Sequence, residues 1–406
     1  MNHEPDDFAR RWKELARVFL KLGAMSYGGP AIMGIMQTEI QEKRAWLSKE
    51  RFLEGLALVN MLPGAAATQL GIFIGHQRAG WRGGLLAGLC FIFPAFLIMM
   101  ALTVLYSNFG ALPYVRDAFY GLGPVVLGIF AVAVYRLARP VLKGSSQFAI
   151  AAGAAVLIAA TPLGIVATLL LAGCVGVALY HSRMRGLLAA LGLVVVTGTY
   201  HWLAPLLTAP EIPAGNTGGA EGLAPGLWDI GTFFFKVGAF TFGGGITVLA
   251  FVQDQVVTQL QWLTPREFLD GLALGQLTPG PILMLAAYVG YKLHGNAGAI
   301  VGAAAIFAPA FVLMLSVVPI MNRVREFAWI KAAMRAIGAA VIGVISVSLV
   351  QMTPHAAPDA FTAALVLLTV ACLLSWKWGP LPVMLGGAIA GAAYRTTPFQ
   401  RLRELL

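Results

Sequence analysis

Two short blocks of the chain each bring together a lysine, a hydroxyl side chain and a run of glycines. Their members are Lys21, Ser26, Gly28 and Gly29 in the first block, and Lys236, Thr241, Gly243 and Gly244 in the second. Consecutive glycines in an apolar run break a helix, and a helix that restarts after the break offers an anion free N–H groups and roughly half a positive charge. A cation and a hydroxyl beside such a break therefore predict a binding site for a small anion.

A second pair of blocks places polar side chains beside Pro-Gly breaks. These blocks contain Asn60, Pro63 and Gly64 in the first case, and Gln276, Thr278, Pro279 and Gly280 in the second. In hydrocarbon each unsatisfied backbone group costs several kcal/mol, so broken backbone is tolerated only where protein or a water-filled cavity covers it. We expect the four breaks to meet near the midplane of the bilayer and these residues to contact the substrate.

Each of these candidates has a second interpretation. A lysine at the end of a segment can extend to the membrane interface, and hydroxyl and amide side chains also join helices inside membranes. Glu54 and Asp270 are paired acids inside the second blocks and are candidates for carrying a coupled proton. In their second interpretation they complement the helix dipole from a first turn.

The composition shows which elements must position these residues. Hydrophobic residues make up 58% of the 406 residues and charged residues only 11%, which lies outside the range of soluble proteins. Apolar runs long enough to span a bilayer recur along the chain, for example residues 85–105, 163–179, 299–318 and 332–350. We predict an all-α, polytopic membrane protein of the bacterial inner membrane.

The net charge of +10 comes from Lys and Arg in short loops beside the apolar runs. This is the positive-inside pattern, so we expect a lipid bilayer and no nucleic acid as partner. Residues 1–21 are polar and basic and lack a cleavage site for a signal peptidase, which predicts a cytoplasmic N-terminus.

Cysteine and histidine provide no sign of a metal site. Cys90, Cys174 and Cys372 are isolated in apolar runs, and the six histidines are scattered along the chain. Because no spacing typical of metal ligands occurs, we expect no metal and no organic cofactor.

The chain consists of two related halves. Residues 19–30 resemble residues 234–245, and residues 52–58 resemble residues 268–274, at a constant offset of about 215. The segment between the halves is rich in Pro and Gly, contains Glu211 and Glu221, and has no Lys or Arg, which indicates a periplasmic location. We therefore divide the chain into an N-terminal transporter repeat (1–203), a periplasmic linker (204–226) and an inverted C-terminal transporter repeat (227–406).

Loop charges agree with this inversion. Residues 136–143 are basic whereas the equivalent residues 353–359 are not, and residues 322–335 are more basic than residues 106–117. Two inverted-topology halves with broken or re-entrant helices at the midplane are a recurring plan of secondary transporters. The direction of the last span stays open, because Lys377 and Arg395 lie at opposite ends of it.

At these blocks the sequence resembles the chromate ion transporter family in its long, two-domain form. The resemblance rests on Phe-x-Lys-x-Gly followed by residues 28–30, on the Gly-Gly-Gly version at 243–245, and on Gly-Leu-Ala-Leu followed by Pro-Gly in both halves. It covers residues 15–105 and 230–320, and it implies efflux of chromate, a tetrahedral dianion, driven by the proton motive force and giving chromate resistance. Gly245 stands where the first block has Pro30, a departure that affects the expected geometry of the second hairpin.

Electrostatics also favour export. Moving one charge across 100 mV is worth about 2.3 kcal/mol, so a dianion that leaves a negative cytoplasm gains about twice that amount. A carrier or channel for sulfate or another oxyanion is the alternative, because backbone N–H groups distinguish such anions only coarsely. A membrane enzyme is disfavoured, since the sequence has no HExxH and no GxSxG motif. A homodimer is compatible with the sequence.

Overall fold

The computed structural model describes residues 6–25, 30–161, 163–193, 225–242, 245, 247–321, 327–376 and 378–396, and within them the chain forms helices and no strand. The first half contains α1 (Asp6–Met25), α2 (Pro30–Gln37), the π-helical turn η1 (Thr38–Glu42), α3 (Lys49–Met61), α4 (Ala66–Phe109), α5 (Pro113–Val141), α6 (Ser145–Ala160) and α7 (Ile165–Tyr180). A further helix covers residues 183–193. The all-α prediction is confirmed.

The second half repeats this order helix by helix. It contains α9 (Leu227–Ala239), α10 (Thr247–Val252), η3 (Gln253–Gln259), α11 (Pro265–Leu277), η4 (Ile282–Met284), α12 (Leu285–Val317), η5 (Val318–Ile320), α14 (Ala328–Ala356), α15 (Ala360–Leu374) and α16 (Pro380–Thr396). Thus α9 corresponds to α1, α11 to α3, α12 to α4 and α14 to α5.

Unusual backbone angles recur at equivalent positions in the two halves. Gly64 has φ 123° and Gly280 has φ 113°, a region that favours glycine. Gly80 (φ 65°) and Gly295 (φ 57°) likewise occupy the left-handed region, each inside a kink of a long helix. The repeat seen in the sequence is therefore a repeat of backbone conformation.

Each half contains a hairpin that does not cross the whole bilayer. The 13 residues of α3 extend about 20 Å, which is shorter than a hydrocarbon core of about 30 Å. The chain returns through the first arm of α4 and reverses again at Ala79 and Gly80, whose φ and ψ are not helical. The helix α11 and the first arm of α12 form the equivalent hairpin, which ends at His294 and Gly295.

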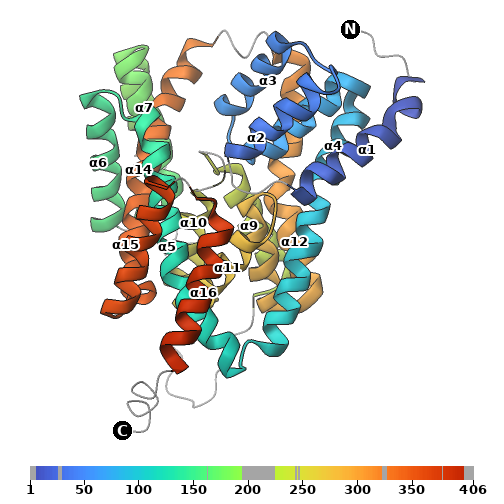
Figure 1. Ribbon diagram of the computed structural model, residues 1–406. Helices are drawn as coiled ribbons and strands as arrows, with labels where there is room; N and C mark the ends of the chain where they lie inside the picture. Colours follow the sequence, from blue (N-terminus) through green and yellow to red (C-terminus); the bar gives the residue numbers. More distant parts are fainter. Residues whose placement is uncertain are drawn as a thin grey trace.

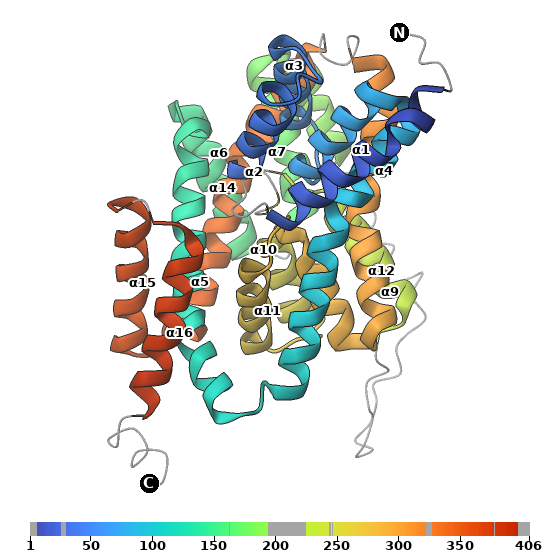
Figure 2. The same cartoon turned by 45° about the vertical axis from the view of Figure 1, so that its right-hand side comes forward.

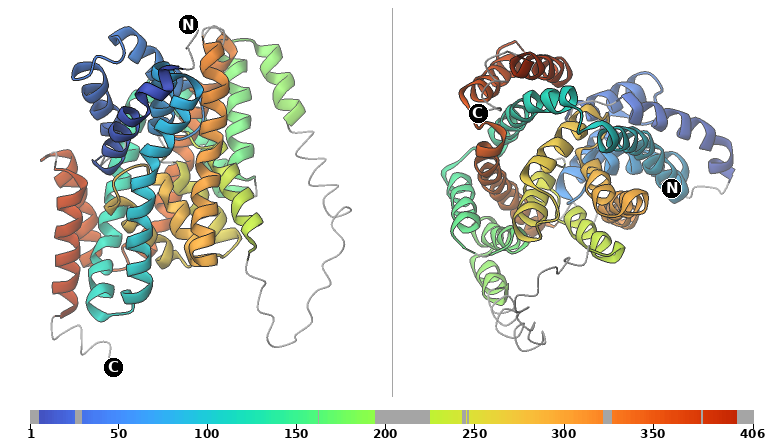
Figure 3. Two further views of the ribbon diagram at one scale, coloured as in Figure 1. Left: turned by 90° about the vertical axis from the view of Figure 1, so that its right-hand side faces the viewer. Right: turned by 90° about the horizontal axis from the view of Figure 1, so that it is seen from below.

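The hairpins of the two halves enter from opposite faces. In Figure 1, α1 and α3 occupy the upper part of the molecule and α9, α10 and α11 the lower part, and the turned view in Figure 2 agrees. The long helices α4 and α12 pack against each other (Figure 3, left). We name the two faces after the helices that begin there, the α3 face and the α11 face. The predicted inverted topology is confirmed.

The halves also exchange helices. In half one, α5 packs against α15 and α16 of half two, and α14 of half two packs against α6 and α7. Small residues allow this approach: a Cβ on Gly176 in α7 would lie 2.5 Å from the carbonyl oxygen of Ala332 in α14. Close backbone contact through small residues is typical of helix packing in membranes.

Four helices of the described chain are long and apolar enough to cross a bilayer, namely α4, α5, α12 with its flanking turns, and α14. Three of the predicted spans lie in α4, α12 and α14. The fourth, residues 163–179, falls on α7, whose 16 residues measure only about 24 Å. The last helix, α16, ends on the α11 face (Figure 1), which gives it the direction that its flanking charges left open.

The tight turns at the hairpin ends lead to a prediction about stability. A Cβ on Gly290 would collide with the carbonyl oxygen of Gly298, whereas a Cβ on Gly153 in α6 would meet no described atom within 4 Å. We expect Gly290→Ala to lower the free energy of unfolding by about 1–3 kcal/mol through overpacking. As the matched control, Gly153→Ala should leave it unchanged or raise it. Thermal unfolding of the purified variants tests this, and equal melting temperatures for both variants would contradict it.

Candidate functional site

The backbone at the first Pro-Gly break contacts the opposite half of the molecule. The N–H of Gly64 donates to the carbonyl oxygen of Thr241, just after α9, over 2.6 Å. A Cβ on Gly64 would also lie 3.5 Å from the Cβ of Ala310 in α12. The break between α3 and α4 is therefore covered by protein from half two.

The second break makes the mirrored approach. A Cβ on Gly280 would lie 2.6 Å from the Cβ of Ala95 in α4 and 3.9 Å from the carbonyl oxygen of Gly23 in α1. Ala95 and Ala310 are equivalent, since each follows the proline inside a long helix. Both breaks thus lie where the halves meet, as the cost of exposing broken backbone to lipid requires.

Polar atoms without partners gather beside the first break. The side-chain amide of Gln69 donates to the carbonyl oxygen of Pro63 over 2.6 Å. The Gln69 Oε1 atom and the hydroxyl of Thr68 are buried and have no hydrogen-bond partner among the described residues. Ala65 provides no side-chain cap for α4, and the first N–H groups of this helix have no partner among the described residues. Such N–H groups can bind an anion.

The equivalent position in half two is apolar. Leu283 and Met284 stand where half one has Thr68 and Gln69, and both are buried. The repeat is therefore symmetric in its backbone but not in its polarity, and the first break is the more suitable place for an anion.

The two threonines at the helix ends already use their hydroxyl protons. Thr241 is fully buried and donates to the carbonyl oxygen of Val237 over 2.6 Å. Thr278 is buried and donates to the carbonyl oxygen of Leu274 over 2.8 Å. In this conformation both hydroxyls stabilise the end of their own helix.

The remaining candidate ligands differ in exposure. Lys21, Lys236 and Asn60 have exposed side chains, Gln276 and Pro63 are half-buried, and Pro279 is buried. The other candidates, Ser26, Gly28, Gly29, Gly243 and Gly244, lie outside the described residues.

The paired acids have different surroundings in the two halves. Glu54 forms an ion pair with Arg51 over 2.6 Å, and 34% of its side chain is exposed. Asp270 is only 7% exposed and accepts a hydrogen bond from the hydroxyl of Tyr106 in α4. Both acids lie beyond the first turn of their helices, so their interpretation as first-turn acids is wrong.

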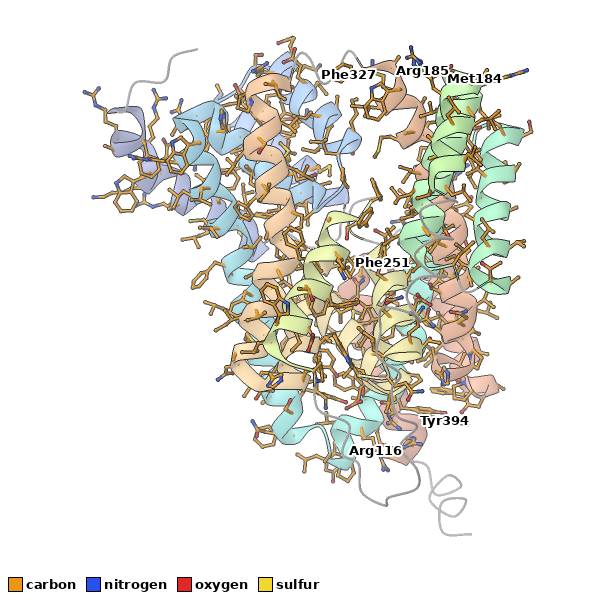
Figure 4. All side chains as sticks on the ribbon, turned by 180° about the vertical axis from the view of Figure 1, so that it is seen from behind. Arg116, Met184, Arg185, Phe251, Phe327 and Tyr394 are labelled. Atoms are coloured by element: carbon orange, nitrogen blue, oxygen red, sulfur yellow. The ribbon has the colours of Figure 1, made fainter. Side chains whose placement is uncertain are left out.

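Two cavities lie toward the α11 face. The first has a volume of about 290 Å³ and is lined by α4, α5, α11 and α12 through residues that include Tyr106, Arg116, Arg266, Asp270 and Lys292. Figure 4 shows Arg116 near this face and Arg185 near the opposite one.

The second cavity has a volume of about 470 Å³ and is lined by η3, α11 and α14. The side-chain amide of Gln253 donates to Gln351 in its wall over 3.1 Å. Sequence reasoning missed Tyr106, Arg116 and Gln351, because nothing in the sequence places these residues beside the second hairpin.

The match to known proteins occurs once in each half, like the Pro-Gly break. The model of a family described as chromate transporter matches residues 13–177 and again residues 228–392, once in each half. The chain belongs to the chromate transporter family. Membership in this family indicates a transport protein that handles an oxyanion in a lipid bilayer.

Relatives within the family match nearly the whole chain. The chain is 32% identical over 387 residues to the chromate transport protein of Cupriavidus metallidurans, covering 93% of this chain and 91% of the relative. It is 32% identical over 395 residues to the probable chromate transport protein of Synechococcus elongatus, covering 94% and 95%. It is 31% identical over 396 residues to the chromate transport protein of Pseudomonas aeruginosa, covering 94% and 92%. No solved structure matches it.

Proposed function

We propose that the protein exports chromate from the cytoplasm, driven by the membrane potential or the proton motive force, and thereby confers chromate resistance. The observation that carries the proposal is the crossing of the two Pro-Gly breaks at the interface of the halves, where Gly64 bonds to Thr241 and Gly280 approaches Ala95. Relatives that match over nine-tenths of the chain carry the name chromate transport protein.

In this proposal the anion binds at the first break. The free N–H groups at the start of α4, the Thr68 hydroxyl and the Asn60 amide supply hydrogen bonds, while Lys21 and Lys236 supply positive charge. Such groups attract any tetrahedral oxyanion, so sulfate is expected to compete with chromate. The hairpin of each half then opens the site to its own face in turn.

The proposed orientation places the α3 face in the cytoplasm. Arg185 lies near that face (Figure 4). Lys43 and Arg44 precede α3, which begins there. Arg136 and Arg139 lie near the end of α5, which runs away from Arg116 on the α11 face. By the positive-inside rule the α3 face is cytoplasmic, which puts the N-terminus inside. Residues 1–203 and 227–406 then form two inverted repeats of an inner-membrane protein, and residues 204–226 connect them in the periplasm.

Chromate accumulation in living cells tests the proposal. Cells that express the protein should hold several-fold less chromate than cells carrying an empty vector, and should survive higher chromate concentrations. The expected difference follows from a dianion leaving a negative cytoplasm, worth about 4.6 kcal/mol at 100 mV. Equal or greater accumulation in the expressing cells would contradict export.

A further inference from the structure

Asp270 joins the two halves through a buried hydrogen bond. It lies in the middle of α11 and is 7% exposed. Its carboxylate accepts a hydrogen bond from the hydroxyl of Tyr106 in α4. Because α4 belongs to half one and α11 to half two, this bond must break if the hairpin of half two moves away from α4. Inward of the bond, the hydroxyl of Thr103 is fully buried and has no partner among the described residues.

Tyr106 and Asp270 line the first cavity, which lies toward the α11 face. Ser107, one residue after Tyr106, lines the same cavity and is exposed. Water and protons can therefore reach Asp270 from this face without passing the midplane.

The charged and titratable groups that interact with Asp270 or line its cavity come from α4, α5, α11 and α12. They are Tyr106 from α4, Arg116 from α5, Arg266 and Glu267 from α11, and Tyr288 and Lys292 from α12. Lys292 pairs with Glu267 over 2.8 Å, and the Tyr288 hydroxyl donates to the carbonyl oxygen of Glu267 over 2.9 Å. Burial would raise the pKa of Glu267, but Lys292 and Thr264 lower it below its ordinary value. Glu267 thus stays ionised, and Asp270 is the acid that lacks a direct ion pair among the described contacts.

Half one contains the same framework with a different connection. Arg51 donates a hydrogen bond to Gln77 over 3.3 Å, and these residues are equivalent to Glu267 and Lys292. In both halves a side-chain contact at these positions therefore joins the two arms of the hairpin. Glu54, the equivalent of Asp270, pairs with Arg51 inside its own hairpin. In half two the acid hydrogen-bonds across to the other half, to Tyr106 of α4.

We propose that Asp270 is a proton-binding site and that its bond to Tyr106 is a proton-released latch closing the α11 face of the transporter. A carboxylate accepts a hydrogen bond about twice as strongly as a neutral acid. A proton that enters through the cavity neutralises Asp270, while Tyr106 keeps its own proton. The weakened bond then lets the hairpin of half two separate from α4. The latch rests on the proposed function only for its use in export, not for its existence.

Cysteine accessibility tests the latch without any transport measurement. The three native cysteines are replaced by serine, and Thr103→Cys reports access behind the latch while Ser107→Cys reports access to the open cavity. Purified protein in lipid nanodiscs, with both faces in contact with solution, is treated with a membrane-impermeant maleimide at about pH 5.5 and about pH 8. Dividing the rate for Thr103→Cys by the rate for Ser107→Cys at each pH removes the effect of pH on thiol reactivity.

We expect this ratio to be about ten-fold higher at the acidic pH, in keeping with the weakening of one charge-assisted bond. In Asp270→Asn and in Tyr106→Phe the ratio should be high at both pH values, and in the matched control Glu54→Gln it should keep its pH dependence. A ratio that is independent of pH in the otherwise wild-type protein, or that keeps its pH dependence in Asp270→Asn, would overturn the latch. If Asp270→Asn does not fold, Tyr106→Phe gives the same decision with the acid intact.

The readout also separates the two proposals. A protein with a pH-dependent ratio but no chromate flux would refute the proposed function and leave the latch in place. A protein that exports chromate with a pH-independent ratio would do the reverse.

Discussion

Gly64→Ala and Gly280→Ala are each expected to reduce chromate export by about ten-fold or more, because the left-handed backbone costs a residue with a Cβ about 1–2 kcal/mol. Steric contact adds to this cost. A Cβ on Gly64 would lie 2.6 Å from Nε2 of Gln69, and a Cβ on Gly280 would lie 2.6 Å from the Cβ of Ala95. Either change displaces the break against the opposite half, where we propose that the anion passes.

Gly275→Ala is the matched control for this loss. Gly275 lies in α11 only five residues before Gly280, and a Cβ there would meet no described atom within 4 Å. Export by this variant should equal that of the wild type. Initial rates in vesicles with equal amounts of folded protein make the comparison, and unimpaired export by both Gly64→Ala and Gly280→Ala would show that the breaks do not line the path.

The second large effect concerns the paired lysines. Lys236→Ala and Lys21→Ala should each lower the rate at low chromate by about ten-fold, which corresponds to a loss of about 1.4 kcal/mol of anion binding. The loss should appear as a higher KM and should be partly restored by arginine, since the charge and not the shape attracts the anion.

Lys13→Ala is the control on the same helix as Lys21, because Lys13 is exposed on the turn that follows the start of α1. Its rate should not change. If export is equal in Lys21→Ala, Lys236→Ala and Asn60→Ala, these residues do not bind the substrate, and the lysines extend to the membrane interface instead.

Most of the fold could be predicted because the repeated motifs contain proline and glycine, which have special backbone requirements. Pro63 with Gly64, and Pro279 with Gly280, mark breaks that the structure contains at those positions, with φ above 110° at both glycines. The loop charges predicted the inversion, because the positive-inside rule depends only on sequence.

Other features depend on tertiary contacts that the sequence does not encode locally. The reversal at Ala79 and Gly80 falls in an apolar stretch that continues into α4, so it was not distinguishable from a continuous span. The exchange of helices between the halves, in which α5 packs against α16, has no periodic signature.

The candidate site was predicted less completely than the fold. The partnership of Tyr106 with Asp270 joins residues 164 positions apart, and only the folded structure brings them together. The repeat itself contains the polar asymmetry of the breaks, because Thr68 and Gln69 align with Leu283 and Met284. This difference between the two halves marks the first break as the more polar one.

Chromate uptake into everted membrane vesicles, in which the proposed periplasmic face lines the lumen, tests the central claim most directly. With a lumen-positive potential the account predicts saturable uptake, which stops when the potential is collapsed and decreases with excess sulfate, since each charge gains about 2.3 kcal/mol per 100 mV. No uptake above vesicles lacking the protein, under either a potential or a proton gradient, would contradict the export of chromate.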